Sequence, residues 1–205
     1  PADLDALLAA NYPNTDKTVG EMIPEKVLVI GENLKVRRFA RYATGVTVPY
    51  IHMAGRIGVL VNMEVEGIDA AAVTELGKDL CMQVAAMNPS FCDKADVDQT
   101  ILDKEKEIQL ALMDNDPKMA SKPLQVKEKI VLGKMSKYYE ENCLMQMEFV
   151  KEKGVSVEQH VAAVAKELGG KISVKSFVRF ERGEGIEKKQ EDFAAEVAAQ
   201  MNMGK

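Results

Sequence analysis

The stretch TVPYIHMAGRIGVLVNMEV, residues 47–65, decides the fold class of this chain. Two runs rich in Val, Ile and Tyr, residues 47–52 and 56–65, flank the short segment Met53-Ala54-Gly55. Runs of this composition favour strands, and a short connection that contains a glycine is typical of a β-hairpin. The stretch therefore predicts two antiparallel strands joined at Met53–Gly55.

Two more segments have a strand pattern. Residues 174–182 are rich in β-branched and aromatic side chains, and residues 32–42 alternate apolar and charged side chains at period two. The alternation in residues 32–42 is typical of a half-exposed strand. Because the strands are mostly connected as hairpins and helical segments surround them, we expect an antiparallel sheet backed by helices, of the α+β class.

Four helices are expected around this sheet, over residues 19–30, 70–87, 156–168 and 187–201. The first is expected to end at Gly31, although Pro24 inside it favours either a later start or a kink. The second has an apolar stripe at steps of three and four residues, which is one face of a helix. That stripe consists of Val73, Leu76, Leu80, Val84 and Met87.

Residues 96–144 have a different pattern from the rest of the chain. Two helices are expected there, over residues 97–113 and 124–139, with Asp114–Pro117 and Lys122-Pro123 between them. Their apolar seams are narrow and their other faces are charged. This pattern favours an antiparallel pair of helices that projects from the molecule rather than two helices buried in a globule. Such a pair buries little apolar surface, so we expect it to be the least stable part.

Composition and charge exclude several classes of protein. The chain has 205 residues, of which 46% are hydrophobic and 29% charged, an ordinary globular mixture. A net charge of -5 argues against a protein that coats DNA or RNA. No stretch reaches the ~18–20 apolar residues that cross a bilayer. Three cysteines without Cys-x-x-Cys spacing favour reduced thiols, so we expect a cytoplasmic protein that contacts neither DNA nor a membrane.

No constellation of residues favours covalent chemistry. His160 is expected to be an exposed helix residue, and His52 to be either a strand-end residue bonded to backbone or a contact residue. Neither lies near a Gly-x-Ser-x-Gly turn. Gly183-Glu184-Gly185 lacks the third glycine of a dinucleotide loop, and no His/Cys cluster has zinc-ligand spacing. The sequence predicts a non-enzymatic interaction protein without cofactor or metal.

One concentrated basic strip has aromatic residues between its charges. It consists of Lys35, Arg37, Arg38 and Arg41, interleaved with Phe39 and Tyr42. Such a strip can follow the phosphates of a nucleic acid. It can equally be a solvated strand face or an edge that binds a protein, and the residues alone leave these alternatives open.

A series of short motifs, in one order along the chain, resembles the elongation factor Ts family. The matches run from Thr18 to Gln200, and they are specific together although each is weak alone. They include IGEN at 30–33, YIH at 50–52, GRIGVLV at 55–61, GKDLCMQVAA at 77–86, FV at 149–150, FVRF at 177–180, GEGIEK at 183–188 and DFAAEV at 192–197.

The resemblance implies a three-stranded antiparallel sheet packed on helices, with a protruding antiparallel helical hairpin. It divides the chain into a remnant of an N-terminal core subdomain (1–45), a C-terminal core subdomain (46–95 and 145–186), an inserted hairpin of the dimerisation type (96–144) and a C-terminal helix module (187–205). The family's small N-terminal helical domain and its Thr-Asp-Phe-Val segment are not visible. We therefore expect the core and C-terminal part of such a factor.

The resemblance also implies a function, which is guanine-nucleotide exchange on elongation factor Tu. The factor would bind the nucleotide-free GTPase and so promote release of GDP, without making or breaking a bond. Ordinary core packing is the alternative role for Ile30, Val150 and Phe193. The partner-binding residues implied by matching position are Ile30, Gly31, Glu32, Asn33, His52, Met53, Phe149, Val150 and Phe193.

Two other functions stay open at the level of the sequence. One is an RNA-binding module of the translation apparatus that uses the basic strip, for which affinity would fall steeply with salt. The other is a structural protein that forms a homodimer through the helical hairpin, as the hairpin does in some members of the family. Sedimentation of a chain without residues 96–144 would test the second.

Overall fold

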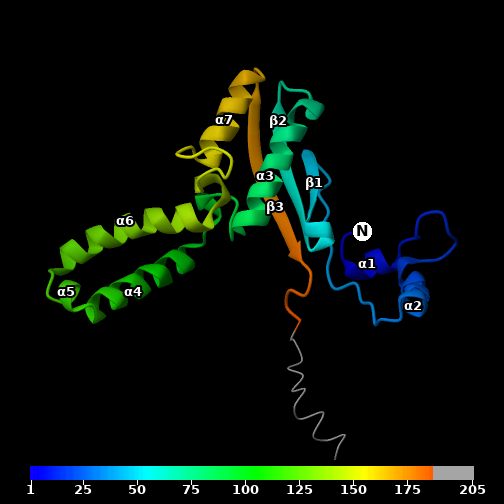
Figure 1. The fold of residues 1–205 in the computed structure, drawn as a ribbon, viewed down its shortest axis with the longest axis horizontal. Helices are drawn as coiled ribbons and strands as arrows, with labels where there is room; N and C mark the ends of the chain where they lie inside the picture. Colours follow the sequence, from blue (N-terminus) through cyan, green and yellow to red (C-terminus); the bar gives the residue numbers. More distant parts are fainter. Residues whose placement is uncertain (187–205) are drawn as a thin grey trace, which may run out of the picture. The chain divides into compact units, whose positions relative to one another are not determined.

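The computed structural model describes residues 1–186, and the chain divides into two units. Unit 1 comprises Pro1–Thr44, and unit 2 begins at Gly45. The helix predicted over 187–201, the module predicted over 187–205 and Phe193 lie outside the described residues. Each unit is described by itself below, with the element labels of Figure 1.

Unit 1 contains two helices, α1 (Leu4–Ala9) and α2 (Val19–Ile30). Helix α2 begins at a capping box, in which Thr18 Oγ1 accepts from the Glu21 amide and the Glu21 carboxylate accepts from the Thr18 amide. These bonds satisfy amides that have no partner inside the helix, and they lower the pKa of Glu21. The helix ends at Gly31, whose φ is 77°. The predicted bounds are confirmed, and the helix continues through Pro24.

The strand predicted over residues 32–42 is wrong. This segment has no regular secondary structure, although Leu34 and Val36 are half-buried while Lys35 and Arg37 are exposed. A strand needs a neighbour that supplies hydrogen bonds to its backbone. The three strands described in residues 1–186 all belong to unit 2 and pair with one another. Residues 34–37 therefore alternate between half-buried and exposed side chains, but their backbone has no neighbouring strand to pair with among the described residues.

Unit 2 is built on a three-stranded antiparallel sheet, which confirms the predicted α+β class. Its strands are β1 (Val46–His52), β2 (Ile57–Glu66) and β3 (Lys171–Glu181), in the order β1-β2-β3. Helices α3 (Thr74–Met87) and α7 (Val157–Glu167) contact each other and the strands (Figure 1). Four short 3-10 helices connect these elements: η1 (Met53–Gly55), η2 (Ala70–Val73), η3 (Lys94–Asp96) and η4 (Leu144–Gln146).

The core of unit 2 lies between the sheet and α3. Residues directly opposite one another in an antiparallel sheet share a face. The register pairs Val61 with both Val48 and Phe177, so one row of apolar side chains crosses all three strands. Close packing requires Gly77 on α3, because a Cβ there would lie 2.4 Å from Val48 Cγ2. Helix and sheet therefore approach more closely than a side chain at this position allows.

Helix α3 is buried over a wider arc than its apolar stripe predicts. Gly77, Cys81 and Gln83 are buried in addition to the stripe, whereas Met87 is 49% exposed. The reason is that α3 packs on β1 and β2 and is also contacted by the segment before α7. An apolar stripe predicts that one face of a helix is buried. The segment before α7 buries part of a second face of α3.

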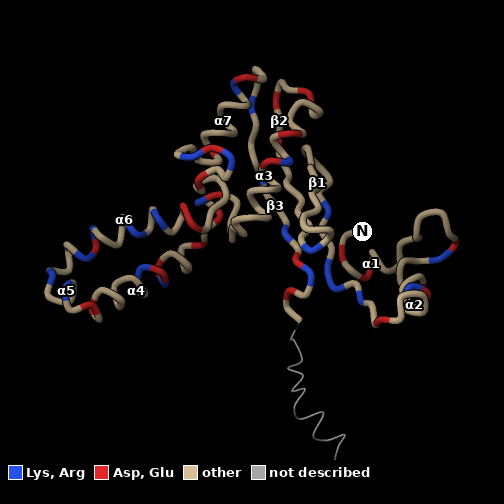
Figure 2. The backbone as a smooth tube through the Cα atoms, viewed as in Figure 1, with Lys and Arg blue, Asp and Glu red and all other residues tan. Residues whose placement is uncertain are grey.

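Helices α4 (Gln99–Asn115) and α6 (Leu124–Asn142) form the predicted antiparallel hairpin, with the short α5 (Pro117–Ala120) at its tip (Figure 1). Charged residues of both signs recur along both long helices (Figure 2). The seam between them buries Met113, Val131 and Met135. At the tip, the buried Lys127 Nζ lies 2.5 Å from Asp114 Oδ1 and donates to the Ala120 carbonyl at 3.0 Å.

Candidate partner-binding surface

The connection between β1 and β2 holds three successive residues at positive φ. The φ values are 49° for Met53, 51° for Ala54 and 91° for Gly55. This region is costly for residues other than glycine, and it persists only where the surrounding structure enforces it. Here the flanking pair His52–Ile57 and the bond from the Arg56 amide to the Met53 carbonyl enforce it. The result is a restrained tip on which Met53 is 59% exposed.

His52 lies at the end of β1, next to this tip. Its Nδ1 is 3.0 Å from the Tyr50 hydroxyl, and the two ring centroids are 5.7 Å apart. The ring is half-buried and is held by a side chain rather than by backbone alone. Tyr50, two residues earlier on the same face of the strand, therefore fixes the orientation of the imidazole.

A charged group lies at the same end of the sheet. The register places Tyr50 and Arg179 opposite Val59, and His52 and Glu181 opposite Ile57. The Arg179 guanidinium donates to Glu181 at 2.8 Å, which lowers the pKa of that carboxyl. In residues 1–186, Arg179 Nε is the one buried side-chain nitrogen or oxygen without a hydrogen-bond partner. Sequence reasoning missed these polar residues, because only the register across β2 places them on the same face of the sheet as His52.

Phe149 and Val150 lie in the loop between η4 and α7, and they differ in burial. Phe149 is 3% exposed and stacks on His160, with ring centroids 4.1 Å apart and an interplanar angle of 20°. The expected exposure of His160 is therefore wrong, because one side of its ring packs on Phe149 and the residue is half-buried. Val150 is 48% exposed, so Val150 is the member of the pair whose side chain reaches the surface.

Helix α3 holds this loop at two points. Buried Gln83 bonds to the backbone at Glu148 and Val150, and exposed Lys151 pairs with Asp79 at 2.6 Å. Sequence reasoning assigned no role to Gln83, because a single polar residue in an amphipathic helix is usually on the solvated face. Its position beside the apolar stripe, three residues after Leu80, was the available signal.

Four of the predicted site residues belong to unit 1 and are described within it. Ile30 is 57% exposed at the last position of α2, and Gly31 is its left-handed C-cap. Glu32 and Asn33 follow and are exposed. The two residues before Ile30 make the end of α2 apolar as well, because the side chains of Leu28 and Val29 are each 84% exposed. Unit 1 thus carries an apolar helix end followed by polar residues.

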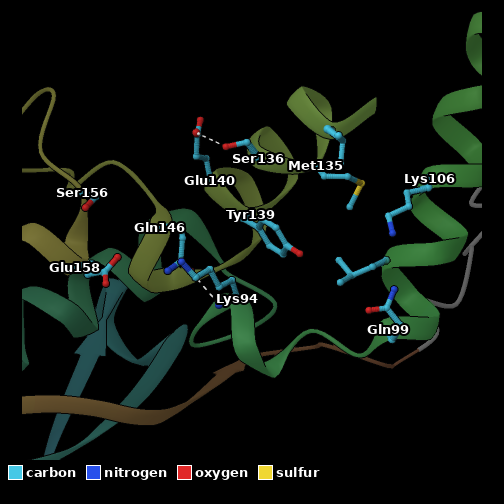
Figure 3. Close-up of a pocket in the computed structure, with 12 residues that line it drawn as sticks. Lys94, Gln99, Lys106, Met135, Ser136, Tyr139, Glu140, Gln146, Ser156 and Glu158 are labelled. Carbon is cyan, nitrogen blue, oxygen red and sulfur yellow. Dashed lines mark hydrogen bonds between the residues drawn. The ribbon is translucent and has the colours of Figure 1, made fainter. Parts of the chain in front are cut away.

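A groove lies at the base of the hairpin, with a volume of about 610 Å³. Figure 3 shows Gln99, Lys106 and Tyr139 of the hairpin on its walls, with Lys94 and Glu158 of the body. Side chains of both charges surround it, so it presents no concentration of one sign that would select a phosphate or a metal ion.

The three cysteines are free and buried. Burial raises the pKa of the Cys81 and Cys92 thiols to about 12 and that of Cys143 to about 11. Because the thiolate is the nucleophile, these side chains are unreactive near neutral pH.

Within the part of the chain that the structure covers, no three His, Cys, Asp or Glu side chains are grouped to hold a metal ion. The helices described up to residue 186 include none that is both long and apolar enough to cross a membrane. Met53 and Val150 are exposed apolar residues on restrained loops of unit 2.

Comparison with known proteins identifies the family. The family model described as Elongation factor TS matches residues 1–184. The chain is 45% identical over 204 residues to Elongation factor Ts of Clostridium botulinum (strain ATCC 19397 / Type A), a match that covers 98% of this chain and 65% of that protein. It is 46% identical over 201 residues to Elongation factor Ts of Clostridium kluyveri (strain NBRC 12016), covering 97% and 64%. The chain thus spans less than two thirds of these relatives, and it belongs to the elongation factor Ts family.

Proposed function

We propose that this chain binds elongation factor Tu in its nucleotide-free state and thereby promotes release of GDP during translation elongation. The observation that carries the proposal is the likeness to Elongation factor Ts over 98% of the chain at 45% identity. A role in translation would place the protein in the cytoplasm. Binding of the GTPase is the primary claim and acceleration of GDP release the secondary one, because the chain corresponds to only part of its relatives.

The mechanism is thermodynamic linkage between two ligands of one GTPase. If the chain lowers the affinity of the GTPase for GDP by some factor, then GDP lowers the affinity for the chain by the same factor. Only differential binding is needed, and no covalent bond changes. The chain is therefore proposed to act without being an enzyme.

Two exposed apolar side chains on restrained loops support a protein partner. Met53 is 59% exposed at a tip held in positive φ, and Val150 is 48% exposed in a loop tethered to α3. A few side chains that fill well-packed pockets of the partner carry most of the binding energy of a typical interface. Loops that are already ordered lose little conformational entropy on binding. Both loops have the form that such anchors require.

Calorimetric titration of the chain into elongation factor Tu tests the proposal, with nucleotide-free GTPase in one arm and excess GDP in the other. We expect tight binding in the first arm and much weaker binding in the second. Release of a fluorescent GDP analogue should accelerate as the chain is added. Binding that is indifferent to GDP would contradict the linkage mechanism.

Matched variants locate the surface in the same assay. Met53→Ala and Val150→Ala are each expected to weaken binding about tenfold, the effect of removing one buried anchor. Leu132→Ala is the control, because Leu132 is 66% exposed on α6 and lies outside the proposed surface. Equal effects of all three substitutions would indicate general loss of apolar contact rather than a site.

The hairpin favours a second interaction, self-association. Ile108 and Leu112 on α4 are 45% and 55% exposed and lie four residues apart, on one face of the helix. We propose that a second copy of the chain covers this face. Sedimentation should show a dimer that Leu112→Glu dissociates, and a monomer at all accessible concentrations would contradict it.

A further inference from the structure

We infer that Gln83 is a positioning residue for partner binding: its side-chain amide fixes the backbone of residues 148–150 so that Val150 faces the partner. The inference rests on the proposed function and adds to it a residue on a different element. Gln83 lies on α3, and it reaches the loop across 65 and 67 positions of sequence.

Both ends of the Gln83 amide are used. The Val150 N–H donates to Gln83 Oε1 at 2.8 Å, and Gln83 Nε2 donates to the Glu148 carbonyl at 3.0 Å. The side chain is 0% exposed. A buried amide is costly unless both its donor and its acceptor have partners. The loop backbone supplies both partners, and the same two bonds restrain the loop.

The two bonds fall on either side of Phe149. Phe149 itself is buried and stacked on His160, and its amide donates to the Val155 carbonyl at 2.8 Å. The carbonyl before Phe149 and the amide after it are therefore fixed by Gln83, while the side chain between them is fixed in the core. Three consecutive residues are held in this way, so the backbone from which the Val150 side chain extends is restrained.

Packing alone would not provide this restraint. A Met at position 83 would fill a similar volume but would offer neither a strong donor nor an acceptor to the loop. The remaining tether from α3, Lys151 to Asp79, is an ion pair whose side chains are 50% and 20% exposed. Such surface pairs contribute little. Gln83 supplies the buried hydrogen bonds between α3 and the loop.

Loss of the two bonds is expected to weaken binding because it changes the conformation of the loop in the unbound protein. The Glu148 carbonyl and the Val150 amide would have to turn toward water, so the loop would spend less time in the competent form. Apparent affinity falls in proportion to the fraction of competent molecules. A loss of about tenfold corresponds to two ordinary hydrogen bonds that are no longer made.

The test compares Gln83→Met with Asp79→Ala, which breaks the exposed tether one helical turn earlier on α3. We expect Gln83→Met to bind nucleotide-free elongation factor Tu about tenfold more weakly, and Asp79→Ala to change the affinity by about twofold or less. The double variant Gln83→Met/Val150→Ala tests whether Gln83 acts through Val150. Because Gln83 acts through Val150, Gln83→Met should have little further effect when Val150 is already truncated.

Hydrogen exchange supplies a measurement that needs no variant. The Val150 amide of the wild-type chain should exchange much more slowly than the Glu152 amide, which donates only within an exposed turn. Rapid exchange at Val150 would overturn the inference even if Gln83→Met failed to fold. In a folded Gln83→Met chain, protection at Val150 should be lost while protection in β2 is retained.

The outcomes separate this inference from the proposed function. A wild-type chain that does not bind elongation factor Tu contradicts the proposed function and, with it, any positioning role. A wild-type chain that binds, together with a folded Gln83→Met chain that binds equally well, overturns the inference alone. Independent, multiplicative effects of Gln83→Met and Val150→Ala would also overturn it, since they would mean that Gln83 acts elsewhere.

Discussion

The body of unit 2 and its helical hairpin are stabilised by very different amounts of buried apolar surface. The body's cluster draws side chains from β1, β2, α3 and α7, including the fully buried Val61, Met63 and Leu80. The hairpin's cluster contains three buried residues, Met113, Val131 and Met135. Because hydrophobic stabilisation scales with buried apolar area, we expect the body to be more stable and the hairpin to open more readily.

Buried polar groups show the same contrast. In the body, the neutral amide of Gln83 bonds to loop backbone without any charge leaving water. In the hairpin, Lys127 is 7% exposed and carries a charge, and its partner Asp114 is 65% exposed at the tip. A charge is tolerated where water is close and a neutral amide where water is excluded. Both side chains hydrogen-bond to the backbone of a connecting segment: Gln83 to residues 148–150, and Lys127 to Ala120.

The largest expected effect is that of Leu80→Ala in the body. Leu80 is fully buried in the core cluster of unit 2, so truncation leaves a cavity that its neighbours cannot fill. We expect the free energy of unfolding to fall by about 3–5 kcal/mol. Urea denaturation measures it, and exchange should accelerate in β2 and α7 as well as in α3. Acceleration confined to α3 would contradict a single cooperative body.

Met113→Ala makes the corresponding change in the hairpin. Met113 is 3% exposed, but the seam around it is narrow and close to water. We expect a loss of about 2–3 kcal/mol, at the low end for such truncations, because water or neighbouring side chains can reach the site. Hydrogen exchange should accelerate in α4 and α6 and stay unchanged in β2. Equal acceleration in β2 would mean that hairpin and body unfold together.

Gly77→Ala should destabilise the body although alanine is the better helix former. A Cβ at this position would lie 2.4 Å from Val48 Cγ2 and 3.0 Å from Met63 Cε, so α3 would have to move off the sheet. We expect a loss of about 1–2 kcal/mol, typical of overpacking. The thermal midpoint measures it.

Gly133→Ala is the matched control for this substitution, within the hairpin. No atom lies within 4 Å of a Cβ built on Gly133. The only expected effect is the higher helix propensity of alanine relative to glycine, which should stabilise α6 by up to about 1 kcal/mol. If both glycine substitutions changed stability in the same direction, the close approach of α3 to the sheet would not be the reason.

The smallest effect on stability is expected for His52→Ala. Its ring is half-buried and its bond to Tyr50 joins two side chains near the surface, where water can replace the lost partner. We expect a change within about 0.5 kcal/mol, together with weaker binding of elongation factor Tu. Denaturation and calorimetry on the same sample separate the two. A loss comparable to that of Leu80→Ala would assign His52 to the core.

Several elements of both units were predictable because their local and tertiary requirements agree. The strand composition of residues 46–66 in unit 2 and the glycine at 31 that ends α2 in unit 1 each specify their element within a few residues. The hairpin helices were predictable for the same reason, from narrow stripes between charged faces. Residues 32–42 had the alternation of a strand but no partner strand, and alternation cannot supply one.

The motifs propose positions for the candidate site, but they do not predict how those positions are held. Matching motifs indicated Met53 and Val150, and both are exposed. Which member of the pair Phe149–Val150 reaches the surface depends on His160, which packs against Phe149 from a different element. The supporting residues Tyr50 and Gln83 become visible only when β1 and α3 are in place.

The sequence by itself determined the elements, because apolar periodicity, caps and turn residues act over a few neighbouring positions. It also determined the family, because short motifs keep their order whatever their contacts. Only the tertiary structure decided what each side chain touches: the wide buried arc of α3, the absence of a strand at 32–42 and the hold of Gln83 on Val150. Burial and hydrogen bonding between residues far apart in sequence arise from packing, and no local pattern encodes them.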